Sequence, residues 1–148
     1  MRHITHIVLH CTATPQNTTI ESIQKYWREH NGWKSPGYHY IIKPSGEAVN
    51  LLPIEKVSNG VAGHNSHSIH ISYIGGIDSK SHALDNRTQP QKDKQVELLK
   101  KFKAMFPEAI ICGHRDFLTK GKPGWKECPS FDVKEWLADI EFEASTNA

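Results

Sequence analysis

The fold is decided by residues 4–11, which read ITHIVLHC. The apolar residues of this stretch are mostly β-branched and form one short run, a pattern that indicates a buried strand. Residues 12–17 include Pro15 and break the run, so His10 and Cys11 lie where the strand ends. The chain therefore begins with one strand of a sheet, and reactive side chains lie at its carboxyl end.

The rest of the chain alternates between strand and helix patterns. In chain order we expect a helix at 19–30, hairpin strands at 38–42 and 48–52, a strand at 68–74, a helix after Thr88, a strand at 109–113 and a helix after Asp132. This order predicts a single α/β domain over residues 1–148, with a mixed sheet of about five strands and three flanking helices. The C-terminal tail is expected to fray from about residue 141.

Local signals refine these elements. Capping boxes are predicted at two helix starts, by Thr18 with Glu21 and by Thr88 with Gln91. The later of these helices has one apolar stripe, formed by Leu98, Leu99, Phe102, Met105 and Phe106. Alternation along the first hairpin strand places Tyr38 and Tyr40 on the same face.

The composition excludes several classes of protein. With 148 residues, 37% hydrophobic and 23% charged, the chain has the size and balance of one globular domain. Its formal net charge of +2 is too small to indicate a nucleic acid partner. No apolar run approaches the roughly 20 residues that cross a bilayer, and the first residues lack a secretory signal pattern. We therefore expect no membrane insertion and a cytoplasmic location until something releases the protein.

Histidine and cysteine indicate a metal site. The chain has ten histidines, and its three cysteines are expected as thiols or metal ligands. His10 follows the first strand, His114 follows the last strand and Cys128 precedes the last helix. Two imidazoles and a thiolate suit a catalytic zinc, because they leave its fourth position for water. The wide spacing, without a compact motif, leaves ordinary buried histidines and a buried thiol as the alternative.

Five motifs resemble those of the zinc-dependent N-acetylmuramoyl-L-alanine amidases, a family that includes phage endolysins and peptidoglycan recognition proteins. The motifs are LHCTAT at 9–14, GYHYII at 37–42, the strand from 68 to the glycines at 75–76, GHRD at 113–116 and KECPSFD at 126–132. They occur in family order and extend over nearly the whole chain, from about residue 4 to residue 137. The sequence is most similar to the small single-domain phage amidases.

The resemblance implies that zinc is held by His10, His114 and Cys128, and that Tyr38 and Lys126 are catalytic. The implied reaction is hydrolysis of the amide between N-acetylmuramic acid and L-alanine in bacterial peptidoglycan. This reaction needs an activated water and a stabilised oxyanion, and zinc supplies both. A fixed cation at Lys126 and a phenolic donor at Tyr38 suit the oxyanion. The proton shuttle stays open between the metal-bound hydroxide and a neighbouring tyrosine or histidine.

The biological role has alternatives. We expect a monomeric phage or prophage endolysin that acts on the cell wall, with a cytosolic amidase for wall fragments as the nearest alternative. A recognition module that binds peptidoglycan without cutting it is a rival of another class, and Cys128 argues against it because a binder needs no thiolate ligand. Binding to an RNA polymerase is implied by family likeness only and has no residue signature.

Other positions carry weaker expectations. His70 departs from the family's Ser-Ile-Gly pattern by placing a side chain where glycine is usual, and it would alter substrate fit if its face lined the groove. Residues 64–67 form a loop that is short compared with the family's, and we assign them no catalytic role. Trp125 is a candidate substrate contact in a loop. Cys11 and Cys112 are expected as small buried residues.

Overall fold

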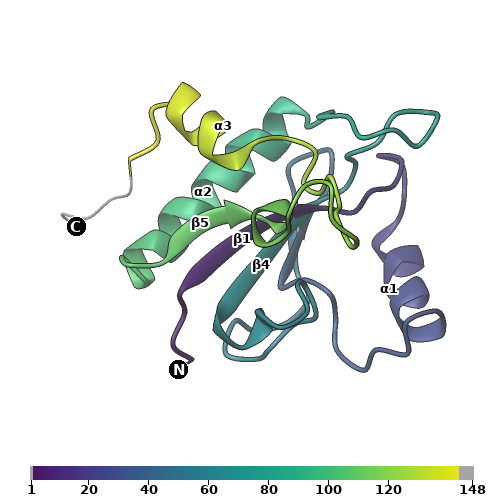
Figure 1. The fold of residues 1–148 in the computed structure, drawn as a ribbon, viewed down its shortest axis with the longest axis horizontal. Coiled ribbons are helices and arrows are strands. Elements are labelled where there is room, and N and C mark those ends of the chain that lie inside the picture. Colours follow the sequence, from purple (N-terminus) through teal and green to yellow (C-terminus); the bar gives the residue numbers. More distant parts are fainter. Residues whose placement is uncertain (1, 144–148) are drawn as a thin grey trace.

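The computed structural model describes residues 2–143 and arranges them as a five-stranded sheet with three α-helices around it (Figure 1). The strands are β1 (His6–Cys11), β2 (Tyr40–Ile42), β3 (Ala48–Asn50), β4 (Ser68–Tyr73) and β5 (Ile110–Gly113). The helices are α1 (Ile20–Glu29), α2 (Gln89–Met105) and α3 (Val133–Asp139), with short 3₁₀ helices η1 (Asn65–His67) and η2 (His114–Phe117). The predicted α/β class, with a mixed sheet of five strands and three helices, is confirmed.

The sheet has the strand order β3-β2-β4-β1-β5. β1 pairs in parallel with β4 and β5, β2 pairs in parallel with β4, and β3 pairs antiparallel with β2 in the predicted hairpin. Parallel strands end at the same edge of a sheet, and that edge is where α/β proteins bind ligands. The segments that follow β1, β4 and β5 therefore come together at one edge.

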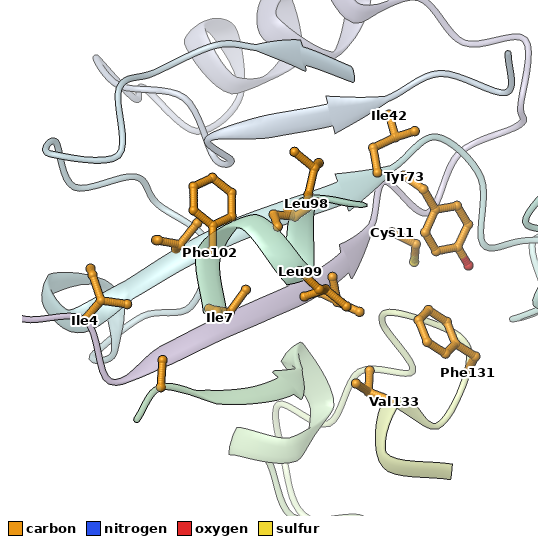
Figure 2. Close-up of a cluster of buried hydrophobic side chains, with 14 residues drawn as sticks. Ile4, Ile7, Cys11, Ile42, Tyr73, Leu98, Leu99, Phe102, Phe131 and Val133 are labelled. Atoms are coloured by element: carbon orange, nitrogen blue, oxygen red, sulfur yellow. The ribbon is translucent and has the colours of Figure 1, made fainter. Parts of the chain in front are cut away.

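Helices cover both faces of the sheet. α1 lies on one face, and α2 and α3 lie on the other (Figure 1). The larger core lies on the α2 side, where Ile7 and Leu9 of β1 join Leu99 and Phe102 of α2 (Figure 2). Side chains alternate between the faces of a strand, so the neighbouring His10 is directed to the α1 face.

The element boundaries differ from the prediction in small ways. α1 is capped by Thr19, whose hydroxyl accepts a hydrogen bond from the backbone N–H of Ser22, so the predicted pairing of Thr18 with Glu21 was wrong. The capping box of Thr88 and Gln91 on α2 is confirmed. The predicted apolar stripe of α2 packs against the core except at Met105, which is 45% exposed.

The hairpin tyrosines lie on opposite faces, which corrects the prediction. The chain bends at His39, and regular pairing begins at Tyr40. Tyr40 packs in the α2-side core against Phe102, whereas Tyr38 packs with the α1-side cluster. This bend places the Tyr38 ring at the carboxyl end of β1.

The end of the described chain still contacts α3. The backbone N–H of Glu141 donates to the Ala138 carbonyl, and that of Phe142 donates to the Leu137 carbonyl. Fraying was expected from about residue 141, and most of that tail, residues 144–148, lies outside the described residues. Among the described residues, none of the helices is long and apolar enough to span a membrane.

Candidate metal centre and active site

The three predicted ligands lie together at the carboxyl edge of the sheet. His10 is the second-last residue of β1, His114 directly follows β5, and Cys128 lies in the loop before α3. One ligand atom from each residue lies within 4.8 Å of the other two. His10 thus forms one cluster of two imidazoles and a thiol with two residues that follow it by more than a hundred positions in the sequence.

Backbone pairing explains why these segments meet. β1 and β5 are in register from His6 with Ile110 to Leu9 with Gly113, so the next residues, His10 and His114, lie side by side at the end of this pairing. Their ring centroids are 5.0 Å apart. The loop with Cys128 is tied to both strands, because the N–H of Arg115 donates to the Cys128 carbonyl at 2.9 Å and the N–H of Cys11 donates to Cys128 Sγ at 3.2 Å.

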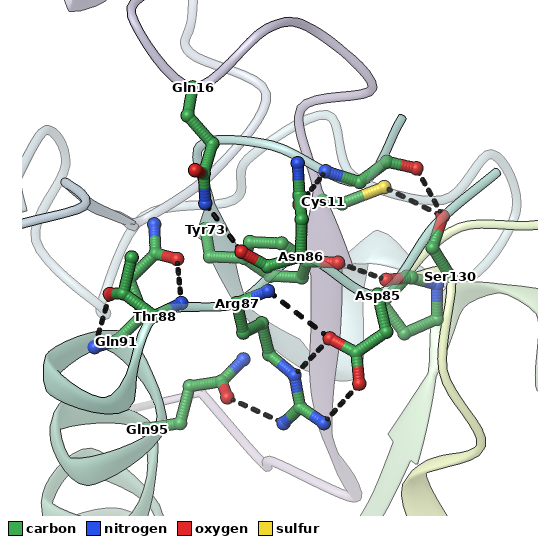
Figure 3. A network of polar contacts seen from close by, with 12 residues as sticks. Cys11, Gln16, Tyr73, Asp85, Asn86, Arg87, Thr88, Gln91, Gln95 and Ser130 are labelled. Carbon is green, nitrogen blue, oxygen red and sulfur yellow. Dashed lines mark hydrogen bonds and ion pairs between the residues drawn. The ribbon is translucent and has the colours of Figure 1, made fainter. Parts of the chain in front are cut away.

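The segment after Cys128 is anchored to the opposite helix layer. Tyr73 Oη donates to the Pro129 carbonyl at 2.7 Å, and the guanidinium carbon of Arg87 lies 3.4 Å from the centroid of the Phe131 ring. Figure 3 shows that the same guanidinium is held by the side chains of Asp85 and Gln95. These contacts hold the third ligand in place from the α2 side of the sheet.

The electrostatics of the cluster suit a bound cation. Burial lowers the pKa of His10 well below its ordinary value, and burial together with the nearby Lys126 charge lowers the pKa of His114 to about 4. Both rings are therefore neutral at pH 7 and have a lone pair to donate. Burial raises the pKa of the Cys128 thiol, so the thiolate needs a neighbouring cation to form.

The donor set fits zinc. Cys128 Sγ lies 3.8 Å from His10 Nδ1. Tetrahedral zinc, with bonds of about 2.3 Å to sulfur and 2.0–2.1 Å to nitrogen, requires a sulfur to nitrogen separation of roughly 3.6 Å. The types of the three ligands, and this separation between two of them, therefore fit a His₂Cys zinc site.

Tyr38 and Lys126 flank the cluster. The Tyr38 ring centroid lies 5.0 Å from that of His10, and its hydroxyl donates to the Cys11 carbonyl at 3.3 Å. Burial raises the pKa of Tyr38 above its ordinary value, so its hydroxyl stays protonated and is a hydrogen-bond donor. Lys126 is exposed, and its side chain lines the same cleft as Tyr38, His114 and Cys128.

The cleft above the cluster has a volume of about 590 Å³. Its far wall comes from α1 and the loop after it, with contributions from Tyr26, Trp27 and Trp33. Trp125, the substrate contact expected from the sequence, is absent from the lining, and its Nε1 donates instead to Glu127 at 3.0 Å. Trp33 lines the cleft although the sequence favoured Trp125 among the tryptophans, because only the tertiary structure brings the loop after α1 to this cleft.

His70 does not line the cleft, which corrects the expectation that it affects substrate fit. It is fully buried on β4, and its Nδ1 lies 2.8 Å from Nε2 of His10. Its Nε2 lies 2.8 Å from Oδ1 of Asn65, a loop residue to which the sequence assigned no role. Cys11 and Cys112 are buried, as expected.

Comparison with known proteins agrees with this site. Residues 1–131 match the family described as N-acetylmuramoyl-L-alanine amidase. The endolysin of Escherichia phage T7 is 33% identical over 141 residues, which cover 94% of this chain and 89% of that protein. The endolysin of Enterobacteria phage K11 is 31% identical over 138 residues, covering 93% and 87% of the two chains.

A solved structure has the same fold. The Ph2119 endolysin from the Thermus scotoductus MAT2119 bacteriophage Ph2119 superposes with a TM-score of 0.76 at 26% identity, covering 97% of this chain and 88% of the other. The family match covers most of the chain, and the matched residues include His10, His114 and Cys128. The chain therefore belongs to the N-acetylmuramoyl-L-alanine amidase family, and the enzyme class predicted from its motifs is confirmed.

Proposed function

We propose that this amidase cuts the bond between N-acetylmuramic acid and L-alanine in peptidoglycan with one zinc held by His10, His114 and Cys128. The observation that carries the proposal is the convergence of these three ligand atoms within 4.8 Å beneath a cleft. Zinc held by these residues would act as a Lewis acid that activates water and polarises the amide carbonyl. The two remaining predicted residues, Tyr38 and Lys126, line that cleft.

We propose that Tyr38 and Lys126 interact with the substrate and do not bind the metal. The protonated Tyr38 hydroxyl and the Lys126 ammonium are donors that face one cleft, and neither is a ligand atom of the cluster. Donors held close to the reacting amide stabilise the negative charge that develops on its oxygen. Before substrate binds, the Tyr38 hydroxyl donates to the Cys11 carbonyl, which keeps the Tyr38 ring beside His10, and this single O–H would turn from that carbonyl to the amide oxygen during the reaction.

We further propose that the protein works as a single-domain phage or prophage endolysin, retained in the cytoplasm until lysis and then acting on the wall. The support is its similarity to the endolysins of phages T7 and K11, which align over nearly all of this chain. The substrate partner is then the peptidoglycan of the host.

The test combines metal analysis with the products released from purified sacculi. We expect about one zinc per chain, new free L-alanine amino termini and no new reducing sugar ends, because cutting the glycan would require a pair of opposed carboxylates. Phenanthroline in excess should stop the release, and added zinc should restore it.

Two results would contradict the proposal in different ways. Release of alanine termini by metal-free protein would refute the zinc site and leave the amidase assignment intact. Tight binding to sacculi without any release, with the site fully loaded, would instead identify a recognition module.

A further inference from the structure

His70 is a buried polar side chain that the proposed reaction does not use. It is fully buried on β4 and belongs neither to the ligand cluster nor to the lining of the cleft. Both of its ring nitrogens have close polar partners, His10 Nε2 on one side and Asn65 Oδ1 on the other, each at 2.8 Å. A buried ring with two such partners has a defined hydrogen-bonding role.

The direction of these hydrogen bonds follows from the backbone. The N–H of Val61 donates to Asn65 Oδ1 at 2.7 Å, and a backbone N–H can only donate, so this oxygen is an acceptor. His70 Nε2 must therefore carry the hydrogen that it shares with Asn65. A neutral imidazole has a single N–H, which leaves His70 Nδ1 as an acceptor.

The same reasoning determines the tautomer of His10. Because His70 Nδ1 accepts, His10 Nε2 must donate to it across the 2.8 Å contact. The lone pair of His10 is then on Nδ1, which is the atom 3.8 Å from Cys128 Sγ. The chain of hydrogen bonds from Val61 to His10 thus directs the lone pair of His10 into the metal cluster.

The position of the His70 ring is tightly constrained. A Cβ atom built on Gly60 would lie 2.4 Å from Cγ and Nδ1 of His70, so the ring packs directly against the backbone of residue 60. The backbone N–H of His70 donates to Nδ1 of His39, another buried histidine, at 3.0 Å. The ring is thus held between a residue that must be glycine and a fixed strand.

We propose that His70 is a positioning residue for the metal site: it accepts the Nε2–H of His10 and so presents Nδ1 of His10 to the metal. This inference rests on the zinc site proposed above. Partners that orient a ligating histidine typically change metal affinity 10- to 100-fold when they are removed. The rival explanation is that His70 only fills space between β4 and residues 60–65.

Two substitutions of similar size separate these explanations. In His70→Asn the side-chain oxygen takes the place of Nδ1. This variant still accepts the hydrogen bond from His10 but loses the hydrogen bond to Asn65. In His70→Gln the amide nitrogen takes the place of Nε2, so it still donates to Asn65 but offers His10 no acceptor. We expect zinc affinity, measured by competition with a chromophoric chelator, to fall on the order of 10- to 100-fold in His70→Gln and to stay near the unchanged protein in His70→Asn.

A spectroscopic measurement reports the tautomer itself. Nitrogen-15 NMR of the imidazoles in the zinc-loaded protein should show His10 protonated at Nε2 and ligating through Nδ1. In metal-free His70→Gln, His10 should become a mixture of both tautomers, whereas His70→Asn should keep the Nε2–H form. A space-filling role predicts equal zinc affinities and the same His10 tautomer in both variants, and that result would overturn the inference.

A third substitution acts on His70 without changing it. Gly60→Ala places a methyl group against the His70 ring, so it should weaken zinc binding in the unchanged protein and have no further effect in a His70→Ala background. Equal effects in both backgrounds would contradict the inference. If the unchanged protein binds no zinc at all, the proposed metal site fails instead, so the two failures are distinguishable.

Discussion

At the residue scale, the site depends on keeping two imidazoles neutral beside a thiol that readily ionises only when a cation is present. Burial lowers the pKa of His10 and His114 and raises that of Cys128. A neutral nitrogen donor and an ionised sulfur donor are the forms that bind zinc, so metal binding must release the thiol proton. The soft thiolate is the donor that distinguishes this set from histidines alone.

Replacing Cys128 with serine should therefore reduce metal binding. The hydroxyl is a harder and far less acidic ligand, and two histidines remain, so zinc affinity should fall by at least the 10- to 100-fold typical of lesser changes around a site. Competition with a chelator measures the affinity. Cys112→Ala is the matched control, because Cys112 is buried outside the ligand cluster and should leave zinc bound.

Replacing Tyr38 with phenylalanine, or Lys126 with alanine, should reduce turnover but not metal content. Each change removes one donor from the cleft, and loss of one oxyanion donor costs about 10²- to 10³-fold in kcat. The measurements are alanine release from sacculi and zinc per chain. Tyr40→Phe on the other face and Lys122→Ala in the same exposed loop are the controls, and zinc loss in parallel with activity would identify the two residues as structural.

At the scale of elements, α1 and the loop after it form the wall that faces the metal cluster. Trp27 of α1 and Trp33 of the loop have ring centroids 6.2 Å apart, and both line the cleft. A Cβ on Gly37 would lie 3.0 Å from the Trp27 ring and 3.1 Å from the Trp33 ring, so the chain passes close beneath both indoles. This wall is the surface on which a glycan or a stem peptide would lie.

Trp33→Ala should weaken substrate binding more than it slows the chemical step. Loss of an aromatic contact worth about 0.5–1.5 kcal/mol corresponds to an increase in KM of roughly two- to tenfold. Kinetics on soluble muropeptides separates KM from kcat. Trp125→Ala is the matched control, because Trp125 does not line the cleft, and an equal effect in both variants would show that Trp33 has no special role.

At the scale of the whole molecule, the sheet buries histidines that must stay neutral for the protein to be stable. Burial, helped by the nearby Arg2 guanidinium, lowers the pKa of His39 to about 4, although the Lys56 carbonyl and Glu55 act in the opposite direction. His39 Nδ1 accepts the N–H of His70, and its Nε2 lies 2.8 Å from the Lys56 carbonyl. Protonation would place an additional donor where an acceptor is required.

The free energy of unfolding should therefore fall in acid. The unfolded chain binds a proton at His39 near pH 6.5 and the folded chain only near pH 4, so this contribution is complete above 6.5 and is lost as the pH falls to about 4. The slope is at most about 1.4 kcal/mol per pH unit for this one proton. Urea unfolding at several pH values, with a chelator present, measures this pH dependence of the free energy of unfolding. The slope should be shallower in His39→Gln than in the unchanged protein, and equal slopes would contradict the prediction.

Local sequence patterns were sufficient to predict the helices and strands and to identify the family. The β-branched run at 4–11, the capping box of Thr88 and Gln91, and the apolar stripe of α2 all depend on residues close in sequence, and all appear in the structure as expected, apart from the exposed Met105. The motifs around His10, His114 and Cys128 likewise placed candidate ligands at the ends of elements. Short-range sterics and capping decide such features, so one sequence contains them.

Contacts between distant segments were decided only by the tertiary structure. The bend at His39 separates Tyr38 from Tyr40, the loop after α1 brings Trp33 instead of Trp125 to the cleft, and the pairing of β1 with β4 turns His70 toward His10. Strand register and the packing of a loop depend on many long-range contacts at once, and a one-residue change in either would send a side chain to the other face. For that reason the sequence by itself determined the elements, the candidate ligands and the enzyme class, whereas the contacts between His10 and His70 and the wall of the cleft were determined by the folded chain.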